Sequence, residues 1–240
     1  MVDGGASLAS SRMRKLLLVI AGVVGLLVVA ARAYERWYFP RNPDRRIDLS
    51  ATVVAPADGR IVYVERVEAG TVPIAIKDRR EIPLDEIVKG EGRPPAGTLI
   101  GIFMSPFDVH YQRSPIAGTV TEVSYHPVEF NHVMGSMFLR SLVGMEPLHA
   151  KSPHIYANER NVIRIDGEGA SAFVVQIADQ QVNKIDCYAA AGDDVELGQQ
   201  IGMIRRGSQV DLFVPGIDPD GFDSIAVGDK VVAGETVLIR

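Results

Sequence analysis

Four short polar segments contain the residues of this chain that could do chemistry. In chain order they hold Asp58, His110, the run Asn158-Glu159-Arg160-Asn161, and the dipeptide Gly207-Ser208. A histidine framed by Pro106 and Pro115 could act as a general acid or base. Taken singly, the other segments are more often structural: Asp58-Gly59 and Gly207-Ser208 are typical of turns, and the Asn158 run is typical of an ion-paired turn. A catalytic interpretation therefore depends on the four segments acting together.

Neither a metal site nor a nucleic-acid partner is expected. The remaining histidines form no compact pair such as H-x-x-x-H; they are His126, His132, His149 and His154. The single cysteine, Cys187, excludes an internal disulfide and a multi-cysteine zinc site. The net charge of −5 gives no support to nucleic-acid binding.

The N-terminal region predicts a membrane anchor. An uncharged apolar run from Leu16 to Ala31 is slightly short for a membrane span, and Trp37 to Phe39 would suit the headgroup level. We expect residues 1–39 to be a retained anchor, residues 40–51 a linker, and residues 52–240 the globular domain. A signal peptide cleaved near Ala31 and a peripheral helix remain open alternatives.

Basic residues flank the apolar run unequally. Arg12, Arg14 and Lys15 precede it, whereas Arg32, Arg36, Arg41, Arg45 and Arg46 follow it. The positive-inside rule then favours a domain on the cytoplasmic side of the inner membrane. The arginine-rich linker is expected to lie against anionic headgroups.

The globular part is predicted to be mainly β, a barrel or sandwich that follows one N-terminal apolar helix. Short β-branched runs alternate with Gly, Pro and Asp at the spacing of such folds. Short helices are expected only near residues 84–88 and 130–143. The pattern G-D-x-V-x-x-G-x-x-[IV] occurs twice, from Gly192 and from Gly228. Its glycines suit tight turns, and the pattern resembles the hairpin turns of biotinyl- and lipoyl-type barrels.

The order of the motifs carries a resemblance to a known family. The chain reads A-D-G, M-S-P-F-D-V-H-Y-Q-R-S-P, N-E-R-N, G-S-Q-V-D-L-F-V-P and G-D-K-V-V-A-G-E-T-V. This series resembles the phosphatidylserine decarboxylase family, especially its short bacterial and archaeal branch, which includes archaetidylserine decarboxylase-like proteins. The resemblance extends from about Val53 to Ile239.

The resemblance implies a proenzyme that cuts itself between Gly207 and Ser208. Ser208 would become a pyruvoyl group, and fragments 1–207 and 208–240 would remain together as a heterodimer. Asp58 and His110 occupy the positions of the family's aspartate and histidine that assist the serine. The pyruvoyl group would form a Schiff base with a serine phospholipid of the membrane and release CO₂ to give the ethanolamine lipid. No metal is implied.

Two further roles are interpretations of this resemblance. His110 is the candidate for returning a proton to the substrate carbon, and Arg113 for meeting the lipid phosphate. Longer family members carry a second histidine at the position of Arg113, and an ion pair with Asp108 is the structural alternative for Arg113. Arg206 replaces the apolar residue expected before Gly207-Ser208.

The rival interpretations are an inactive family member and a non-enzymatic, membrane-tethered barrel module of the export-adaptor type. The sequence leaves open a homodimer, as well as the choice between diacyl and archaeal dialkyl lipid tails.

Overall fold

The computed structural model describes residues 4–68, 71–76, 80–83, 96–145, 152–179, 185–205, 208–223 and 225–240. The chain divides into two units, Met1–Arg41 and Asn42–Arg240. Because the two units are not placed relative to each other, each is described by itself.

The first unit is the expected N-terminal apolar helix. Helix α1 (Gly4–Ala33) continues into the π-helical turn η1 (Tyr34–Tyr38) and ends just before Pro40, since the residue before a proline disfavours helix. The segment Arg12–Tyr38 has 27 residues, and an 18-residue window within it has a mean hydropathy of 2.6. At 1.5 Å per residue it spans roughly 40 Å, more than the roughly 30 Å of a bilayer core. The helix is therefore long and apolar enough to cross a membrane.

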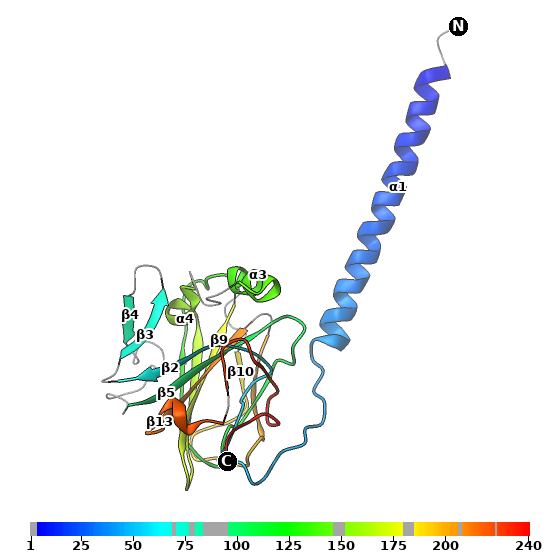
Figure 1. The fold of residues 1–240 in the computed structure, drawn as a ribbon. Helices are drawn as coiled ribbons and strands as arrows, with labels where there is room; N and C mark the ends of the chain where they lie inside the picture. The colour runs from blue at the N-terminus through cyan, green and yellow to red at the C-terminus, as the bar shows by residue number, and fades with distance from the viewer. Residues whose placement is uncertain are drawn as a thin grey trace. The chain divides into compact units, whose positions relative to one another are not determined.

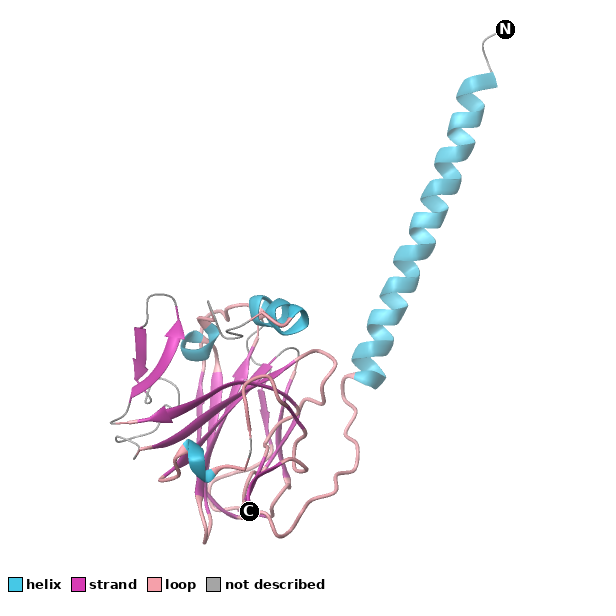
Figure 2. Cartoon of the chain, in the orientation of Figure 1, coloured by secondary structure: helices cyan, strands magenta, loops and turns pink. Residues whose placement is uncertain are grey.

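The second unit is mainly β, which confirms the coarse part of the predicted fold class. Its strands are β1 (Val53–Val54), β2 (Gly59–Val67), β3 (Thr71–Ile76), β4 (Arg80–Pro83), β5 (Gly97–Met104), β6 (Tyr111–Arg113), β7 (Gly118–His126), β8 (Arg160–Asp166), β9 (Ser171–Ala178), β10 (Ile185–Cys187), β11 (Asp194–Val195), β12 (Gln200–Ile204), β13 (Ser208–Pro215), β14 (Lys230–Val231) and β15 (Val237–Ile239). Its helices are α3 (Gly135–Val143), α4 (His154–Ala157) and the 3₁₀ turn η2 (Pro219–Gly221). Figure 2 shows how strands dominate this unit.

The central feature is a curled antiparallel sheet with the order β11-β7-β8-β9-β13-β5-β2-β14 (Figure 1). Smaller sheets are formed by β10-β12-β6, β1-β15 and β3-β4. Strand β13 lies in the middle of the large sheet, paired with β5 on one side and β9 on the other. Its backbone is therefore hydrogen-bonded along both edges.

Two hydrophobic cores cover the two faces of the large sheet. Val210, Leu212 and Val214 of β13 join a core that also takes residues from β1, β12 and β15. Phe213 and its neighbours on the other face pack with residues of α3 and α4. Because strand side chains alternate between faces, β13 contributes to both cores.

One of the two short predicted helices lies in the described residues. Helix α3 covers Gly135–Val143, within the predicted 130–143 range, and ends at Gly144, whose φ of 66° is favourable for glycine. The residues before it form a loop, where Asp179 accepts a hydrogen bond from the backbone N–H of Met134 (2.9 Å). The other predicted helix, residues 84–88, lies outside the described residues.

The sequence repeat corresponds to a repeated structure. Asp193 and Asp229 each accept a bond from a backbone N–H three residues earlier, at 2.8 Å in both copies. The second glycines, Gly198 and Gly234, have φ values of 74° and 77°. The first copy leads into β11 beside β7, and the second into β14 beside β2. The likeness to biotinyl and lipoyl barrels stays a prediction.

Residues 42–48, called the strap below, lie on the domain and contact both copies of the repeat. The Asn42 amide donates to Gln200 (2.7 Å), and the Arg46 backbone N–H donates to Glu235 (3.0 Å). The Ile47 side chain lies where a Cβ on Gly198 or Gly234 would be, 2.5 and 2.7 Å from its Cδ1. Two glycines with positive φ thus make the space that Ile47 fills.

Alanine at Gly198 should therefore destabilise the protein more than alanine at Gly192. Gly192 has a φ of 96° with nothing near its Cβ position, so Gly192→Ala costs only backbone strain, about 1–2 kcal/mol. Gly198→Ala adds a clash with Ile47, which we expect to cost a further ~1 kcal/mol or more. Melting temperatures of the two variants test this, and equal losses would show that Ile47 yields without cost.

Candidate active site

Ser208 is the first residue of the central strand β13 and is fully buried. It pairs with Met104 of β5 and Ala178 of β9, and its hydroxyl donates to the Met104 sulfur at 3.3 Å. Arg206 and Gly207 lie outside the described residues. A chain cut just before Ser208 would therefore leave its new terminus at the end of a doubly paired strand, inside the protein.

His110 is also fully buried, and one hydrogen bond defines its tautomer. Its Nδ1 lies 3.0 Å from the Asp108 carbonyl oxygen. A carbonyl oxygen only accepts, so Nδ1 carries the hydrogen, and in the neutral ring Nε2 is the basic nitrogen. The His110 carbonyl accepts bonds from the Gln112 amide (2.9 Å) and the Ile204 N–H (3.2 Å). The loop that carries this histidine is thus fixed to β12, which leads toward Ser208.

A chain of side-chain amides links the surroundings of His110 and Ser208. The Gln112 amide, which holds the His110 carbonyl, lies 3.6 Å from the same Met104 sulfur that accepts the Ser208 hydroxyl. Gln176 donates to Gln112 at 2.8 Å, and Asn161 donates to Gln176 at 2.9 Å. These polar groups stand in an otherwise apolar core. They suit a small polar group at position 208.

Asp58 lies at the same end of the sheet as Ser208. Arg60 of β2 and Gln209 of β13 pair with Phe103 of β5 from opposite sides, so the residues just before them lie level at one end of the sheet with β5 between them. Arg45 Nη2 lies 3.0 Å from each carboxylate oxygen of Asp58, and the Ala233 N–H donates to Oδ1 at 2.8 Å. Within the described residues, Asp58 has no hydrogen bond to His110. Ser208 and its two predicted helpers, Asp58 and His110, are gathered at one end of the fold, but not as a contiguous triad.

Arg113 is held by other contacts than the predicted ion pair with Asp108. Its guanidinium donates to the Gly198 carbonyl (2.9 Å) and to the Asn42 side chain (3.0 Å). Asp108 instead accepts bonds from the hydroxyl and N–H of Ser105. The ion-pair expectation is therefore wrong, because Asp108 is used to close its own turn. In this structure Arg113 fastens the strap to the repeat.

The Asn158 run is buried and is not the exposed ion-paired turn typical of such a sequence. The Asn158 amide donates to the carbonyls of His132 (2.9 Å) and Ala178 (2.8 Å). The Ala178 N–H in turn donates to the Glu159 carbonyl. Since Ala178 is the strand partner of Ser208, this run fixes one wall of the site.

A second polar cluster, on the other face of β13, was not foreseen from the sequence. The Gln209 side-chain amide donates to the Tyr63 hydroxyl (2.7 Å) and to Asp211 (2.6 Å), and its Oε1 lies 3.2 Å from His154 Nε2. Burial raises the pKa of Asp211 to about 6 and lowers the pKa of His154 to about 4. The alternation of Gln209 and Asp211 with apolar residues is typical of a solvent-facing strand face. Only the packing of α3 and α4 shows that this face is buried.

The residues around the Ser208 end carry exposed apolar side chains. They are Phe107, Phe130, Val133, Leu139, Val143 and Met145. Leu139 and Val143 share one face of α3, one turn apart, whereas Met137 of the same helix is buried. The loop before α3 is joined through Met134 to Asp179, next to the strand partner of Ser208. This apolar surface therefore adjoins the candidate site.

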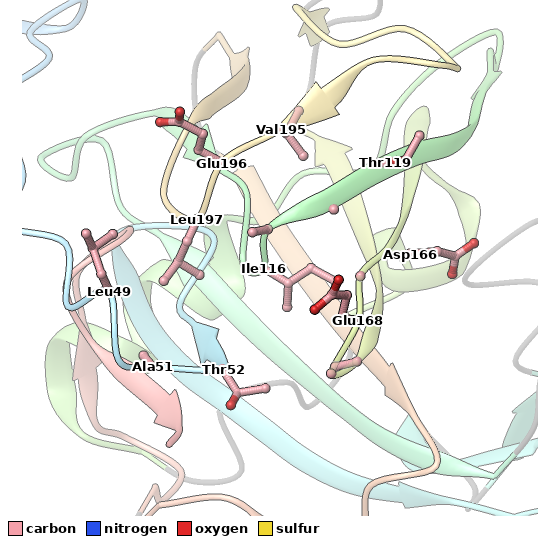
Figure 3. Close-up of a pocket in the computed structure, with 15 residues that line it drawn as sticks. Leu49, Ala51, Thr52, Ile116, Thr119, Asp166, Glu168, Val195, Glu196 and Leu197 are labelled. Carbon is pink, nitrogen blue, oxygen red and sulfur yellow. The ribbon is translucent and has the colours of Figure 1, made fainter.

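An open surface groove of about 950 Å³ lies elsewhere in the domain. Figure 3 shows its labelled side chains coming from residues 49–52, from 116–119, from 195–197 and from the turn after β8. That turn is at the opposite end of β9 from Ala178, the partner of Ser208. The groove is therefore separate from the candidate site.

Comparison with known proteins identifies the class to which this fold and site belong. The family model described as phosphatidylserine decarboxylase matches residues 36–239. This chain is 35% identical to the phosphatidylserine decarboxylase proenzyme of Gluconacetobacter diazotrophicus over 206 residues, covering 85% of this chain and 75% of that one. It is 37% identical to the proenzyme of the same name from Mycolicibacterium gilvum, covering 89% and 76%. A relative from Methanocaldococcus jannaschii, named for archaetidylserine, is 33% identical and covers 84% and 87%.

The chain thus belongs to the phosphatidylserine decarboxylase family, a family of pyruvoyl-dependent carboxy-lyases made as proenzymes. This confirms the resemblance drawn from the sequence motifs. Among the described residues, no cluster of three or more His, Cys, Asp or Glu side chains could hold a metal ion.

Acid should weaken the cluster around His154. The unfolded chain takes up a proton on this histidine near pH 6.5 and the folded chain only near pH 4, so stability is lost as pH falls through this window. We expect a loss of about 2–3 kcal/mol between pH 7 and pH 4.5. Unfolding of Ser208→Ala protein with and without His154→Asn measures it. Protonation of Asp211 affects stability in the opposite direction, and it does so in both proteins. The difference between the two curves of stability against pH therefore reports His154, and parallel curves would contradict the prediction.

Proposed function

We propose that this chain cleaves itself between residues 207 and 208 and then decarboxylates a serine phospholipid to the corresponding ethanolamine lipid. The observation that carries the proposal is the placement of Ser208. In a member of this family, it begins a buried central strand, with the His110 loop and a chain of amides beside it.

In the cleavage step, the Ser208 hydroxyl oxygen attacks the carbonyl carbon of residue 207. Its proton passes to Nε2 of His110, and the Ser208 nitrogen leaves with a proton, so that the peptide bond becomes an ester. The ester then undergoes elimination. The Ser208 Cα proton is removed, the Cβ–Oγ bond breaks, and residue 207 leaves as a carboxylate that keeps the Oγ oxygen. Water then replaces the nitrogen, which departs as ammonia, and a ketone remains. The Nδ1 bond of His110 to Asp108 supports Nε2 as the base.

The residues around Ser208 fit a pyruvoyl group. The amides of Gln112 and Gln176 supply hydrogen-bond donors and acceptors beside a position where the rest of the core is apolar. The ketone itself supplies an electrophile for the substrate amine and a sink for the electrons released with CO₂. Protonated at Nε2, His110 would return a proton to the substrate carbon. The role of Arg113 at the lipid phosphate would require it to leave its bonds to Gly198 and Asn42.

The two fragments are expected to remain together as one folded unit. Strand β13 belongs to fragment 208–240 but pairs over its length with β5 of fragment 1–207, and with β9 as well. Its side chains also enter both cores. Separation would expose two strand edges and the buried apolar face, so no disulfide is needed to hold the fragments.

A phospholipid substrate agrees with two surfaces of the protein. The apolar helix α1 could anchor the chain to a membrane, and the exposed apolar side chains near Ser208 suit contact with lipid. We propose that the domain works at the inner membrane from the cytoplasmic side, as the basic residues after the helix favour.

Maturation is the direct test of this function. Purified wild-type protein is expected to contain fragments 1–207 and 208–240, the latter of 33 residues (240 − 207), blocked at its N-terminus and carrying a reactive ketone. Ser208→Ala should remain a single chain without decarboxylase activity, because it lacks the hydroxyl that attacks. Intact-mass analysis measures both. An active protein with an uncut chain and a free Ser208 would disprove the proposal, and an uncut, inactive wild type would indicate an inactive family member.

The same assay separates the helpers from the other histidines. Asp58→Asn and His110→Ala should slow cleavage about 100-fold or more, the usual range for loss of an acid–base group. Their combination should be far from additive if they act as a unit. Replacement of His126 or His132 is the matched control and should leave cleavage largely intact. Wild-type cleavage rates in both Asp58→Asn and His110→Ala would remove these residues from the mechanism.

Topology has its own test. The wild-type protein is expected to stay in membranes after a high-salt wash, because apolar burial of α1 is insensitive to salt, and deletion of residues 1–39 should release a folded domain. In spheroplasts, protease added outside should spare the domain. Its rapid digestion with the membrane intact would place it on the outer side instead.

A further inference from the structure

The strap brings a buried arginine to Asp58. The Arg45 side chain is only 7% exposed, and its Nη2 lies 3.0 Å from both oxygens of Asp58, which is 13% exposed. Arg45 was expected to face anionic headgroups with the rest of the linker, and this expectation is wrong for it, because the side chain turns into the domain. Its neighbour Arg46 is exposed and uses only its backbone N–H in the strap contact.

A buried ion pair is an unusual way to fasten a linker. Removing both charges from water costs several kcal/mol, and the mutual attraction offsets this only when the geometry is good and other bonds are satisfied. Here the Arg45 Nε is buried without a hydrogen-bond partner among the described residues. Apolar side chains such as Ile47 fasten the strap without this cost. The pair is therefore better explained by what it does for Asp58 than by the stability it adds.

Arg45 and Ala233 together use both oxygens of Asp58. Nη2 bridges Oδ1 and Oδ2, and the Ala233 N–H adds a second donor to Oδ1. Ala233 belongs to the second copy of the repeat, on fragment 208–240, whereas Arg45 belongs to the strap. The orientation of the carboxylate is thus set from two sides before the chain is cut.

The strap itself is held in place on either side of Arg45. Asn42 bonds to Gln200 and accepts from Arg113, and Ile47 lies against the glycines at 198 and 234. These contacts leave Arg45 little freedom to move away from Asp58. The strap therefore delivers a cation to a fixed point at the Ser208 end of the sheet.

We propose that Arg45 is a positioning residue for self-cleavage. Arg45 holds the Asp58 carboxylate in place, so maturation requires the strap to be bound to the domain. The inference rests on the proposed function and on the assignment of Asp58 as a helper. Arg45 acts through Asp58 and touches neither Ser208 nor substrate. The segment that joins the membrane helix to the domain is then part of the processing machinery.

The test compares a variant that loses the positive charge of Arg45 with one that keeps it, in the full-length chain. Freshly synthesised Arg45→Gln protein should cleave about tenfold more slowly or worse, because the uncharged amide no longer holds the carboxylate. Arg45→Lys should cleave within about threefold of wild type, since a single nitrogen makes both contacts and an ammonium can replace it. Arg46→Gln is the matched control and should cleave normally. The rate is followed by intact mass as fragment 208–240 is formed.

A coupling measurement distinguishes positioning from simple fastening. In the Asp58→Asn background, Arg45→Gln should slow cleavage no further, because the group it positions is already gone. Melting temperatures of the same variants in uncut Ser208→Ala protein report folding separately. Two outcomes would overturn the proposal if Asp58→Asn still slows cleavage. One is a wild-type cleavage rate in Arg45→Gln, and the other is an equal slowing in Arg45→Gln and Arg45→Lys. Normal cleavage of Asp58→Asn would instead show that the helper assignment beneath it is wrong.

Discussion

The structure depends on the position of β13, a central strand whose first residue follows the proposed cleavage site. A serine in a loop would leave a free chain end after cleavage, whereas Ser208 is held by ladders to β5 and β9. Those ladders would keep the proposed new terminus among the groups that surround the intact bond. The walls of the site follow from this pairing, since Met104 and Ala178 are the strand partners of Ser208. The same arrangement would hold the two proposed fragments in one folded body without any covalent link between them.

Placing chemistry at the end of a buried strand requires polar groups inside the protein. On one face of β13 the amides of Gln112, Gln176 and Asn161 bond to one another, and on the other face Gln209 joins Tyr63, Asp211 and His154. Buried polar atoms are costly unless paired, so each network also fixes the strands that carry it. The shifted pKa values of Asp211 and His154 record the cost that remains. Hydrogen bonds thus add to the apolar packing that holds the strands around the site.

The repeated turns and the strap connect this site to the N-terminal region. The two copies of the repeat lie beside β7 and β2, and their second glycines leave room for Ile47 between them. The strap so seated brings Asn42 to Arg113 and Arg45 to Asp58. Residues that read as a hydrophilic linker are therefore part of the domain. A few ordered residues thus connect the apolar helix to the domain that holds the proposed processing site.

The family, the apolar helix, the mainly β character and the repeat could all be predicted from the sequence alone. These follow from local signals: motif order, hydropathy, β-branched runs and glycine spacing. It gave no sign that Gln209 and Asp211 are buried, because alternation describes a strand face but not what covers it. It also left Arg45 among surface arginines and paired Arg113 with Asp108, since contacts between distant segments have no local pattern. These partners are known from the folded structure alone, because they depend on which strand ends meet and on how the strap crosses the two turns.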